Sequence, residues 1–128
     1  MIIYLSGPMR GYPQDNWPAF INATAQLRAA GYDVLSPAEH TMGMGHDPRT
    51  QERQAGFDLK AALRWACDAV LRSDAVIVLD GWGGSLGANA EVALAKAAGI
   101  DVVPLADALM AAEHRPDVAA GPGIGGAS

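Results

Sequence analysis

Residues 75–84 read Ala-Val-Ile-Val-Leu-Asp-Gly-Trp-Gly-Gly, and this stretch decides the fold. Its first five residues are all apolar, which is typical of a strand buried on both faces of a parallel sheet. A glycine-rich turn follows directly, and helical spacing begins at residue 85. A strand, a tight turn and a helix in that order indicate one unit of an α/β protein.

Segments on both sides of this unit repeat the same alternation. We expect further strands at residues 1–5, 32–35 and 101–105, and helices at residues 16–30, 57–72 and 85–98, with a short one ending near residue 113. The alternation predicts a doubly wound, flavodoxin-like parallel sheet of about four to five strands in the order 2-1-3-4, with helices on both faces. Because the order reverses between strands 1 and 3, a ligand crevice should open at their carboxyl ends.

Length and composition favour a single globular domain. The chain has 128 residues, of which 50% are hydrophobic and 18% are charged. We therefore assign residues 1–114 to one domain and predict a disordered tail at residues 115–128. Residues 39–54 are polar and aperiodic, which predicts a long loop of the kind that covers a ligand.

Charge, cysteine and histidine content narrow the possible partners. The net charge is −5 without a cluster of lysines or arginines, which argues against a nucleic-acid partner. No stretch approaches the roughly 20 apolar residues of a membrane span, and we identify no secretory signal. The single cysteine, Cys67, has no activating neighbour, so we predict that it is buried and inert and that the protein is cytoplasmic. Since His40, His46 and His114 lack ligand spacing, we predict no metal site.

The glycine-rich turn after residue 80 leads into the helix at residues 85–98. Ser85 is a natural N-cap, and the unpaired amides of a helix N-terminus attract an anion. The turn lacks the Gly-Lys-Ser/Thr of a Walker loop and the G-x-G-x-x-G of a dinucleotide site. On these residues alone, a purely structural turn and an anion site are both open.

Three further residues could carry chemistry. Glu91 lies on an otherwise apolar helical run, where a carboxylate is costly unless it faces a crevice. Tyr4 lies on the neighbouring first strand, and its hydroxyl could reach a carboxylate at the sheet edge. Arg10 follows that strand with a planar guanidinium that suits a phosphate. Each has a simpler alternative, namely an exposed glutamate, a core tyrosine and a solvated arginine.

Two motifs together carry a resemblance to a known family. The first is Tyr4-Leu5-Ser6-Gly7-Pro8-Met9-Arg10-Gly11, and the second is Asp80-Gly81-Trp82-Gly83-Gly84-Ser85-Leu86-Gly87-Ala88-Asn89-Ala90-Glu91. With both in view, the chain resembles the nucleoside 2-deoxyribosyltransferase superfamily over about residues 1–105. It looks most similar to small, often phage-borne members of unassigned function and to 2′-deoxynucleoside 5′-phosphate N-hydrolases.

The resemblance implies a mechanism. In that family a glutamate on the helix after the third strand attacks the anomeric carbon of a 2-deoxynucleoside and the base leaves. Water or a second base then resolves the glycosyl-enzyme. Glu91 matches this nucleophile, and Tyr4 matches the tyrosine that orients it. The resemblance also implies that no organic cofactor or metal takes part and that the chain forms a homodimer or a larger assembly.

The position six residues before Glu91 implies the class of substrate. Family members that act on free nucleosides tend to carry Asp there, whereas 5′-monophosphate N-glycosidases carry Ser together with an Arg in the first turn. This chain has Ser85 and Arg10, which both attract a phosphate, so we expect a 2′-deoxynucleoside 5′-monophosphate. Trp82 and the loop at residues 39–54 are candidate covers for the base. The expected substrate-binding residues are Gly7, Pro8, Met9, Arg10, Gly11, His40, Asp80, Trp82, Ser85, Gly87 and Asn89.

One position departs from the family pattern. The family places a second carboxylate, which helps the base to leave, on the helix before the third strand, and the matching position holds Ala66. Asp68 lies roughly 200° further around a helix, so it is a candidate catalytic residue only if the register shifts. The departure leaves slow catalysis and binding without catalysis open. We expect Ala66→Asp to raise any N-glycosidase rate.

Two alternative functions stay open. One is a non-catalytic nucleotide sensor or sponge on the same fold, which the missing carboxylate favours. The other is a phosphoribohydrolase or NAD-cleaving enzyme, which also places a glutamate beyond a glycine-rich turn.

Overall fold

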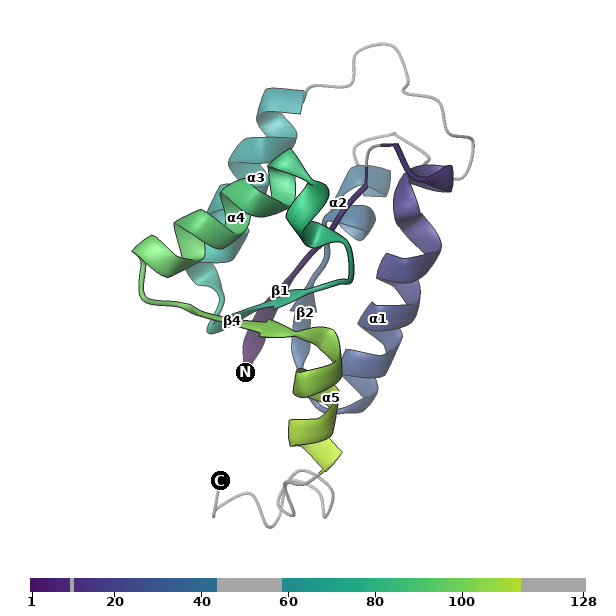
Figure 1. The fold of residues 1–128 in the computed structure, drawn as a ribbon, viewed down its shortest axis with the longest axis vertical. Coiled ribbons are helices and arrows are strands. Elements are labelled where there is room, and N and C mark those ends of the chain that lie inside the picture. The colour runs from purple at the N-terminus through teal and green to yellow at the C-terminus, as the bar shows by residue number, and fades with distance from the viewer. Residues whose placement is uncertain (10, 44–58, 114–128) are drawn as a thin grey trace.

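The computed structural model describes residues 1–9, 11–43 and 59–113, which alternate between strands and helices (Figure 1). In chain order the elements are β1 (Ile2–Ser6), α1 (Trp17–Ala29), β2 (Asp33–Leu35), α2 (Pro37–Gly43), α3 (Leu59–Arg72), β3 (Ala75–Val78), α4 (Leu86–Ala97), β4 (Asp101–Pro104) and α5 (Leu105–Glu113). Except for α2, every predicted first or last residue that the structure describes lies within one residue of the observed one. Across the described ranges, no helix is both long enough and apolar enough to cross a membrane.

The strands form one parallel sheet in the order β2-β1-β3-β4, which confirms the predicted fold class and strand order. In the central strand β1, Tyr4 lies between Leu35 of β2 and Val76 of β3. The carboxyl ends of β1 and β3 lie side by side, because Ser6 pairs with Val78. The sheet thus brings together the ends of the two strands that precede the glycine-rich turns.

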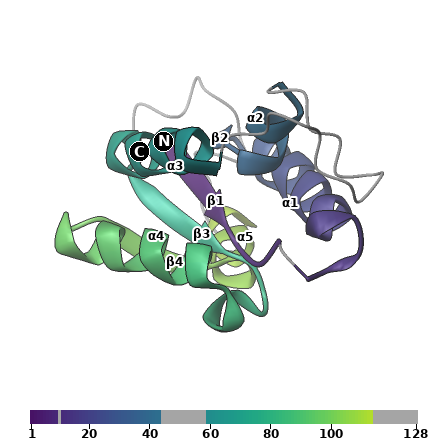
Figure 2. The ribbon, with the colours of Figure 1, turned by 90° about the horizontal axis from the view of Figure 1, so that it is seen from above.

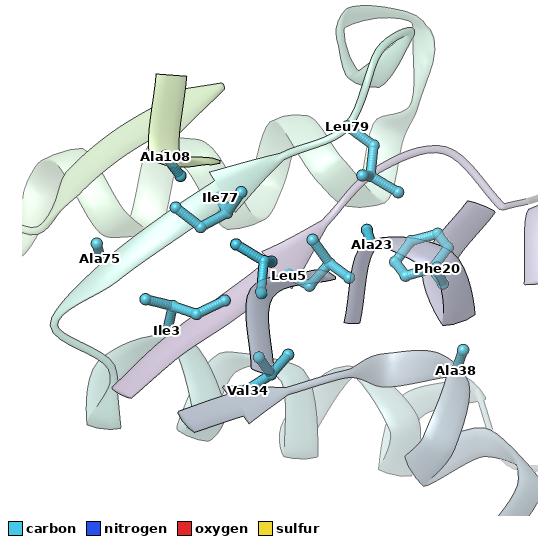
Figure 3. Packing of buried hydrophobic residues seen from close by; sticks show 11 residues of the cluster. Ile3, Leu5, Phe20, Ala23, Val34, Ala38, Ala75, Ile77, Leu79 and Ala108 are labelled. Carbon is cyan, nitrogen blue, oxygen red and sulfur yellow. The ribbon is translucent and has the colours of Figure 1, made fainter. Parts of the chain in front are cut away.

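Each face of the sheet has its own core because alternate residues of a strand point to opposite faces. Ile3 and Leu5 pack with Phe20 of α1 and with residues of α5 in one core (Figure 3). Tyr4 packs on the other face with residues of α3 and α4. Figure 2 shows α1 and α4 on opposite sides of β1. Ser6, two residues after Tyr4, shares the face that α3 and α4 cover.

The loop predicted at residues 39–54 is wrong at its start, because Pro37–Gly43 form helix α2. Ser36 and Pro37 match the serine and proline that often begin a helix, and Glu39 completes a Ser-x-x-Glu pattern. The His40 N–H donates to the Ser36 carbonyl at 3.2 Å and closes the first turn. The local start signal therefore outweighs the absence of hydrophobic periodicity. Residues 44–54 of the predicted loop lie outside the described residues.

Helix α3 faces the sheet with small residues and leaves two leucines exposed. Leu59 and Leu63 are exposed, and the prediction that Cys67 is buried is wrong because its side chain is exposed as well. The helix packs instead through small residues, including Ala66 and Ala69. Positions 59, 63 and 67 recur every four residues, so they share a face that turns away from this contact.

Two close approaches join the turns at the carboxyl edge of the sheet. Gly7 lies so near Leu79 that a β-carbon on the glycine would be 2.8 Å from the leucine Cβ. Gly81 has a φ of +86°, and a β-carbon there would be 2.7 Å from the Tyr12 hydroxyl oxygen. The turn after β1 and the turn after β3 therefore meet at the edge where a ligand crevice is predicted.

We expect Gly81→Ala to destabilise the protein by about 1–3 kcal/mol, since a left-handed backbone disfavours a β-carbon and the new methyl group meets Tyr12. Urea unfolding measures the change. Gly83→Ala is a matched control in the same turn, because a β-carbon there has nothing within 4 Å. Its free energy of unfolding should change by less than about 0.5 kcal/mol. Equal midpoints for the two variants would contradict the prediction.

Candidate functional site

Glu91 is held by two hydroxyl groups of β1. Tyr4 Oη donates to Glu91 Oε2 at 2.8 Å, and Ser6 Oγ donates to Glu91 Oε1 at 2.6 Å. Both donors are fully buried. Glu91 lies in the second turn of α4, so the helix supplies the carboxylate and the strand supplies both hydroxyls. The structure thus brings Glu91 and Tyr4 together, as the sequence led us to expect, and adds Ser6.

The Glu91 carboxylate is partly buried, and the two groups that contact it are uncharged hydroxyls. Burial raises the pKa of Glu91 above its ordinary value, and the hydrogen bonds from Ser6 and Tyr4 oppose that rise. Burial and the nearby Glu91 carboxylate raise the pKa of Tyr4 well above its ordinary value, so its phenol is a neutral donor. No arginine or lysine of the described residues forms an ion pair with Glu91. A partly buried carboxylate that has neutral donors and, among the described residues, no counter-ion is typical of a functional group rather than of a structural ion pair.

An aromatic stack lies beside Tyr4. His40 of α2 and Trp65 of α3 stack with ring centroids 4.1 Å apart and planes 4° apart. The Trp65 ring lies 6.1 Å from the Tyr4 ring. Burial lowers the pKa of His40, so its imidazole is neutral at neutral pH. The stack connects His40, a predicted binding residue, to the group that holds Glu91.

The first residues of α4 have the geometry of an anion site. Ser85 Oγ accepts a hydrogen bond from the Ala88 N–H at 3.1 Å, which makes Ser85 the N-cap and leaves its hydroxyl hydrogen to donate. Leu86 and Gly87 are the first residues of the helix, and their amides have no acceptor within it. The helix dipole adds to the attraction for a negative group at this end.

Asn89 holds the turn that leads into α4. Its side-chain amide donates to the carbonyl oxygens of Trp82, Gly83 and Ser85 at 3.4, 2.9 and 2.8 Å. Trp82 is partly buried and packs against the core that contains Tyr4. The sequence predicts Asn89 and Trp82 as substrate-binding residues. In the structure, the Asn89 amide and the Trp82 carbonyl also take part in the hydrogen bonds that hold the turn.

A hollow of about 520 Å³ lies at the carboxyl edge on the opposite face of the sheet. Leu79 and Asp80 at the end of β3 line it, together with Tyr12 and residues of α1 and α5. Asp80 is a predicted binding residue, but Glu91 does not line this hollow. The hollow therefore lies at the predicted edge, while the carboxylate points to the other side of the sheet.

The turn after β1 is held by the Asn16 side-chain amide and by the Tyr12 backbone N–H. The carbonyl groups of Pro8 and Met9 accept hydrogen bonds from the chain that follows, at 2.9 and 3.2 Å. The Met9 side chain packs against the core on the α1 face, and Gly11 has a φ of +85°. Arg10 lies outside the described residues, so its contact with a phosphate stays a prediction. The positions of His46, His114 and the tail at residues 115–128 lie outside them as well.

On helix α3, one of the two positions considered for the second carboxylate is buried and the other is exposed. Ala66 is only 6% exposed and packs in the core with Tyr4. The Asp68 side chain is 67% exposed, and its Oδ2 pairs with Arg72 Nε at 2.8 Å. The structure does not bring Asp68 to Glu91, and the position that packs near Tyr4 holds a methyl group.

Sequence reasoning missed Ser6 and Trp65. The signal for Ser6 was present, because a residue two positions after Tyr4 in a strand must share its face. Trp65 precedes the buried Ala66 on α3, but its stack with His40 depends on α2, which was predicted to be a loop. Its place beside Tyr4 therefore followed from no local pattern.

The chain matches the model of a protein family. The model of the family described as a domain of unknown function (DUF4406) matches residues 1–104. The matched segment includes Tyr4, Ser6, Trp65 and Glu91, and it ends with the last residue of β4. No curated protein matches the chain.

Proposed function

The chain belongs to the DUF4406 family, and we propose that it cleaves or exchanges the N-glycosidic bond of a 2′-deoxynucleoside 5′-monophosphate with Glu91 as the nucleophile. The observation that carries the proposal is the partly buried Glu91 carboxylate, which accepts hydrogen bonds from the buried hydroxyls of Tyr4 and Ser6 near the start of α4. A resemblance to the nucleoside 2-deoxyribosyltransferase superfamily supplies the reaction class.

The reaction has two steps. A Glu91 oxygen attacks C1′ of the sugar, the bond between C1′ and the base nitrogen breaks, and the base leaves with the electron pair and takes a proton from solvent. Water then attacks C1′ and gives up a proton to solvent, the ester bond to Glu91 breaks, and the carboxylate is restored. A second base in place of water gives transfer. Tyr4 orients the carboxylate throughout, since its phenol is neutral and buried.

The start of α4 suits the phosphate of this substrate. Ser85 and the amides of Leu86 and Gly87 supply donors at the positive end of the helix dipole. Glu91 follows Ser85 by six residues, which is roughly 9 Å along a helix axis. That separation leaves room for a deoxyribose between a phosphate at the helix start and a carboxylate one and a half turns later.

We expect Ser85→Asp to lose binding of the 5′-monophosphate while binding of the matching nucleoside persists. Aspartate caps a helix as well as serine does, so the start of α4 is preserved while the added charge repels a phosphate. Thermal shifts with a panel of 2′-deoxynucleosides and their 5′-monophosphates measure binding. The monophosphate affinity should fall by about tenfold or more in the variant.

The same panel tests the proposed function in the unaltered protein. Chromatography should detect free base released from a 2′-deoxynucleoside 5′-monophosphate. Equal thermal shifts with a nucleoside and its monophosphate would refute the monophosphate assignment. Faster turnover of ribonucleotides or NAD would select a phosphoribohydrolase or NAD-cleaving activity instead.

A second candidate function is a nucleotide-binding protein without catalysis. The methyl group of Ala66 favours it, because no second carboxylate contacts Glu91 among the described residues. Base released over hours by excess protein, and lost in Glu91→Ala, would decide for the enzyme.

We also propose that the chain forms a homodimer or a larger assembly and that it is cytoplasmic. Light scattering after size-exclusion chromatography tests the assembly.

A further inference from the structure

We propose that Ser6 is a second positioning residue for Glu91, which fixes the plane of the carboxylate for attack on a sugar carbon. The inference rests on the proposed function, because it assigns a role in the attack by Glu91. Ser6 belongs to the first sequence motif, but neither its residue type nor the resemblance assigned it a task.

The hydrogen bond from Ser6 is short and its donor is fixed. The distance of 2.6 Å from Ser6 Oγ to Glu91 Oε1 lies in the range of hydrogen bonds between a hydroxyl and an ionised carboxylate. Ser6 is fully buried and pairs with Val78 in the sheet. Its backbone carbonyl accepts a hydrogen bond from the Leu79 N–H at 2.9 Å. Gly7, the next residue, lies so close to Leu79 that a β-carbon on it would be 2.8 Å from the leucine Cβ.

Two donors determine an orientation that one donor leaves open. The last torsion of a glutamate side chain is broad and roughly two-fold, so a carboxylate with one hydrogen bond can rotate about it. Tyr4 holds Oε2 and Ser6 holds Oε1, which fixes the plane of the group. Each oxygen keeps a lone pair that can face the sugar. Loss of Ser6 should therefore slow the chemical step more than it weakens substrate binding.

The same hydrogen bond affects the charge of Glu91. Burial raises the pKa of Glu91, and the bond from Ser6 opposes this rise more than the bond from Tyr4 does. In the described part of the chain, few other ionisable groups could alter the pKa of Glu91. Apart from Tyr4, the ionisable side chains on the elements packed against α4 are all exposed, as is Lys96 on α4 itself. These exposed side chains are Lys60, Arg64, Cys67, Asp68, Arg72 and Asp101. A change in the titration of Glu91 on loss of the serine hydroxyl can thus be assigned to that bond.

The test compares Ser6→Ala and Ser6→Thr with the unaltered protein. Threonine retains the hydroxyl and suits a strand, whereas alanine removes only the donor. Ser73→Ala is the matched control, because Ser73 is a buried serine whose hydroxyl donates to the Val70 carbonyl at the end of α3. The ¹³C shift of the Glu91 side-chain carboxyl, assigned by its absence in Glu91→Gln, is followed against pH. The same proteins give kcat and KM against pH with a deoxynucleoside monophosphate.

In Ser6→Ala we expect an upward shift of the Glu91 pKa and a kcat lower by roughly tenfold to a hundredfold, with KM changed less than threefold. Ser6→Thr should recover both values, and Ser73→Ala should leave both unchanged. A Glu91 titration that is identical in Ser6→Ala and the unaltered protein overturns the inference, whether or not turnover is found. Absence of turnover in the unaltered protein overturns the proposed function instead, and the titration separates the two failures.

Discussion

Glu91→Gln should abolish release of free base and at the same time make the folded protein more stable at pH 7. Glutamine has the shape of glutamate but cannot form the glycosyl ester, so we expect base release to fall by about a thousandfold or more. The amide can accept a hydrogen bond from one hydroxyl and donate to the other, which keeps Tyr4 and Ser6 paired. Loss of activity therefore need not come from loss of structure.

The gain in stability follows from the direction in which the pKa of Glu91 shifts. Burial raises this pKa in the folded state, so the folded protein holds the proton more strongly than the unfolded chain does. Stability linked to this group is complete below the unfolded pKa and is lost as pH rises through the raised folded pKa. At pH 7 the folded protein therefore contains a partly buried acid whose charged form burial disfavours, a cost that glutamine lacks. We expect a gain of about 1 kcal/mol.

Thermal unfolding of both proteins from pH 4 to pH 8 measures this difference. The advantage of Glu91→Gln should be present at pH 7 and should shrink on acidification, because the glutamate then becomes neutral too. Glu91→Ala is the control for lost contacts: it removes the charge but also leaves both hydroxyls without an acceptor, so it should gain less. A glutamine variant that is less stable at every pH would show that the carboxylate contributes to folding rather than to a reaction.

The fold was predictable because its signals are local and repeated. The apolar run at residues 75–79, the helical spacing on each side and the glycines between them determine a parallel α/β sheet, and the chirality of crossovers reduces the possible strand orders. The exception was α2, where Ser36 and Pro37 signal a helix start in a segment without hydrophobic periodicity. A search for start signals in aperiodic segments would have found it.

The candidate site was predictable only where the position of a residue in a strand or helix determines the direction of its side chain. The pairing of Tyr4 with Glu91 follows from two neighbouring elements at one edge, and Ser6 follows from strand alternation. The stack of His40 on Trp65 joins α2 to the next helix, α3, across residues 44–58, and no local pattern indicates such a contact. The role of Asn89 was not predictable either. A side-chain amide early in a helix can bind a ligand or hold the preceding turn, and the sequence does not distinguish the two roles.

Ala66→Asp should lower stability by about 2–4 kcal/mol and raise the rate of base release by about tenfold or more. The destabilisation follows from burial, because Ala66 is 6% exposed and packs with Tyr4 in the core on the α3 and α4 face. The gain in rate follows from the same burial. A carboxyl group among apolar side chains keeps its proton more strongly, and a neutral acid near the sugar can protonate the departing base.

A second aspartate variant on α3 separates the two effects. Ala69 is fully buried one turn further along the same helix, so Ala69→Asp should destabilise the protein without raising the rate. Ala66→Asn should fill the same space without supplying an acid, and its rate should stay at the unaltered level. If Ala66→Asp and Ala66→Asn release base equally fast, protonation of the base does not limit the reaction. In that case the methyl group at position 66 is no deficiency, and Glu91 with its two hydroxyl donors is sufficient for the proposed reaction.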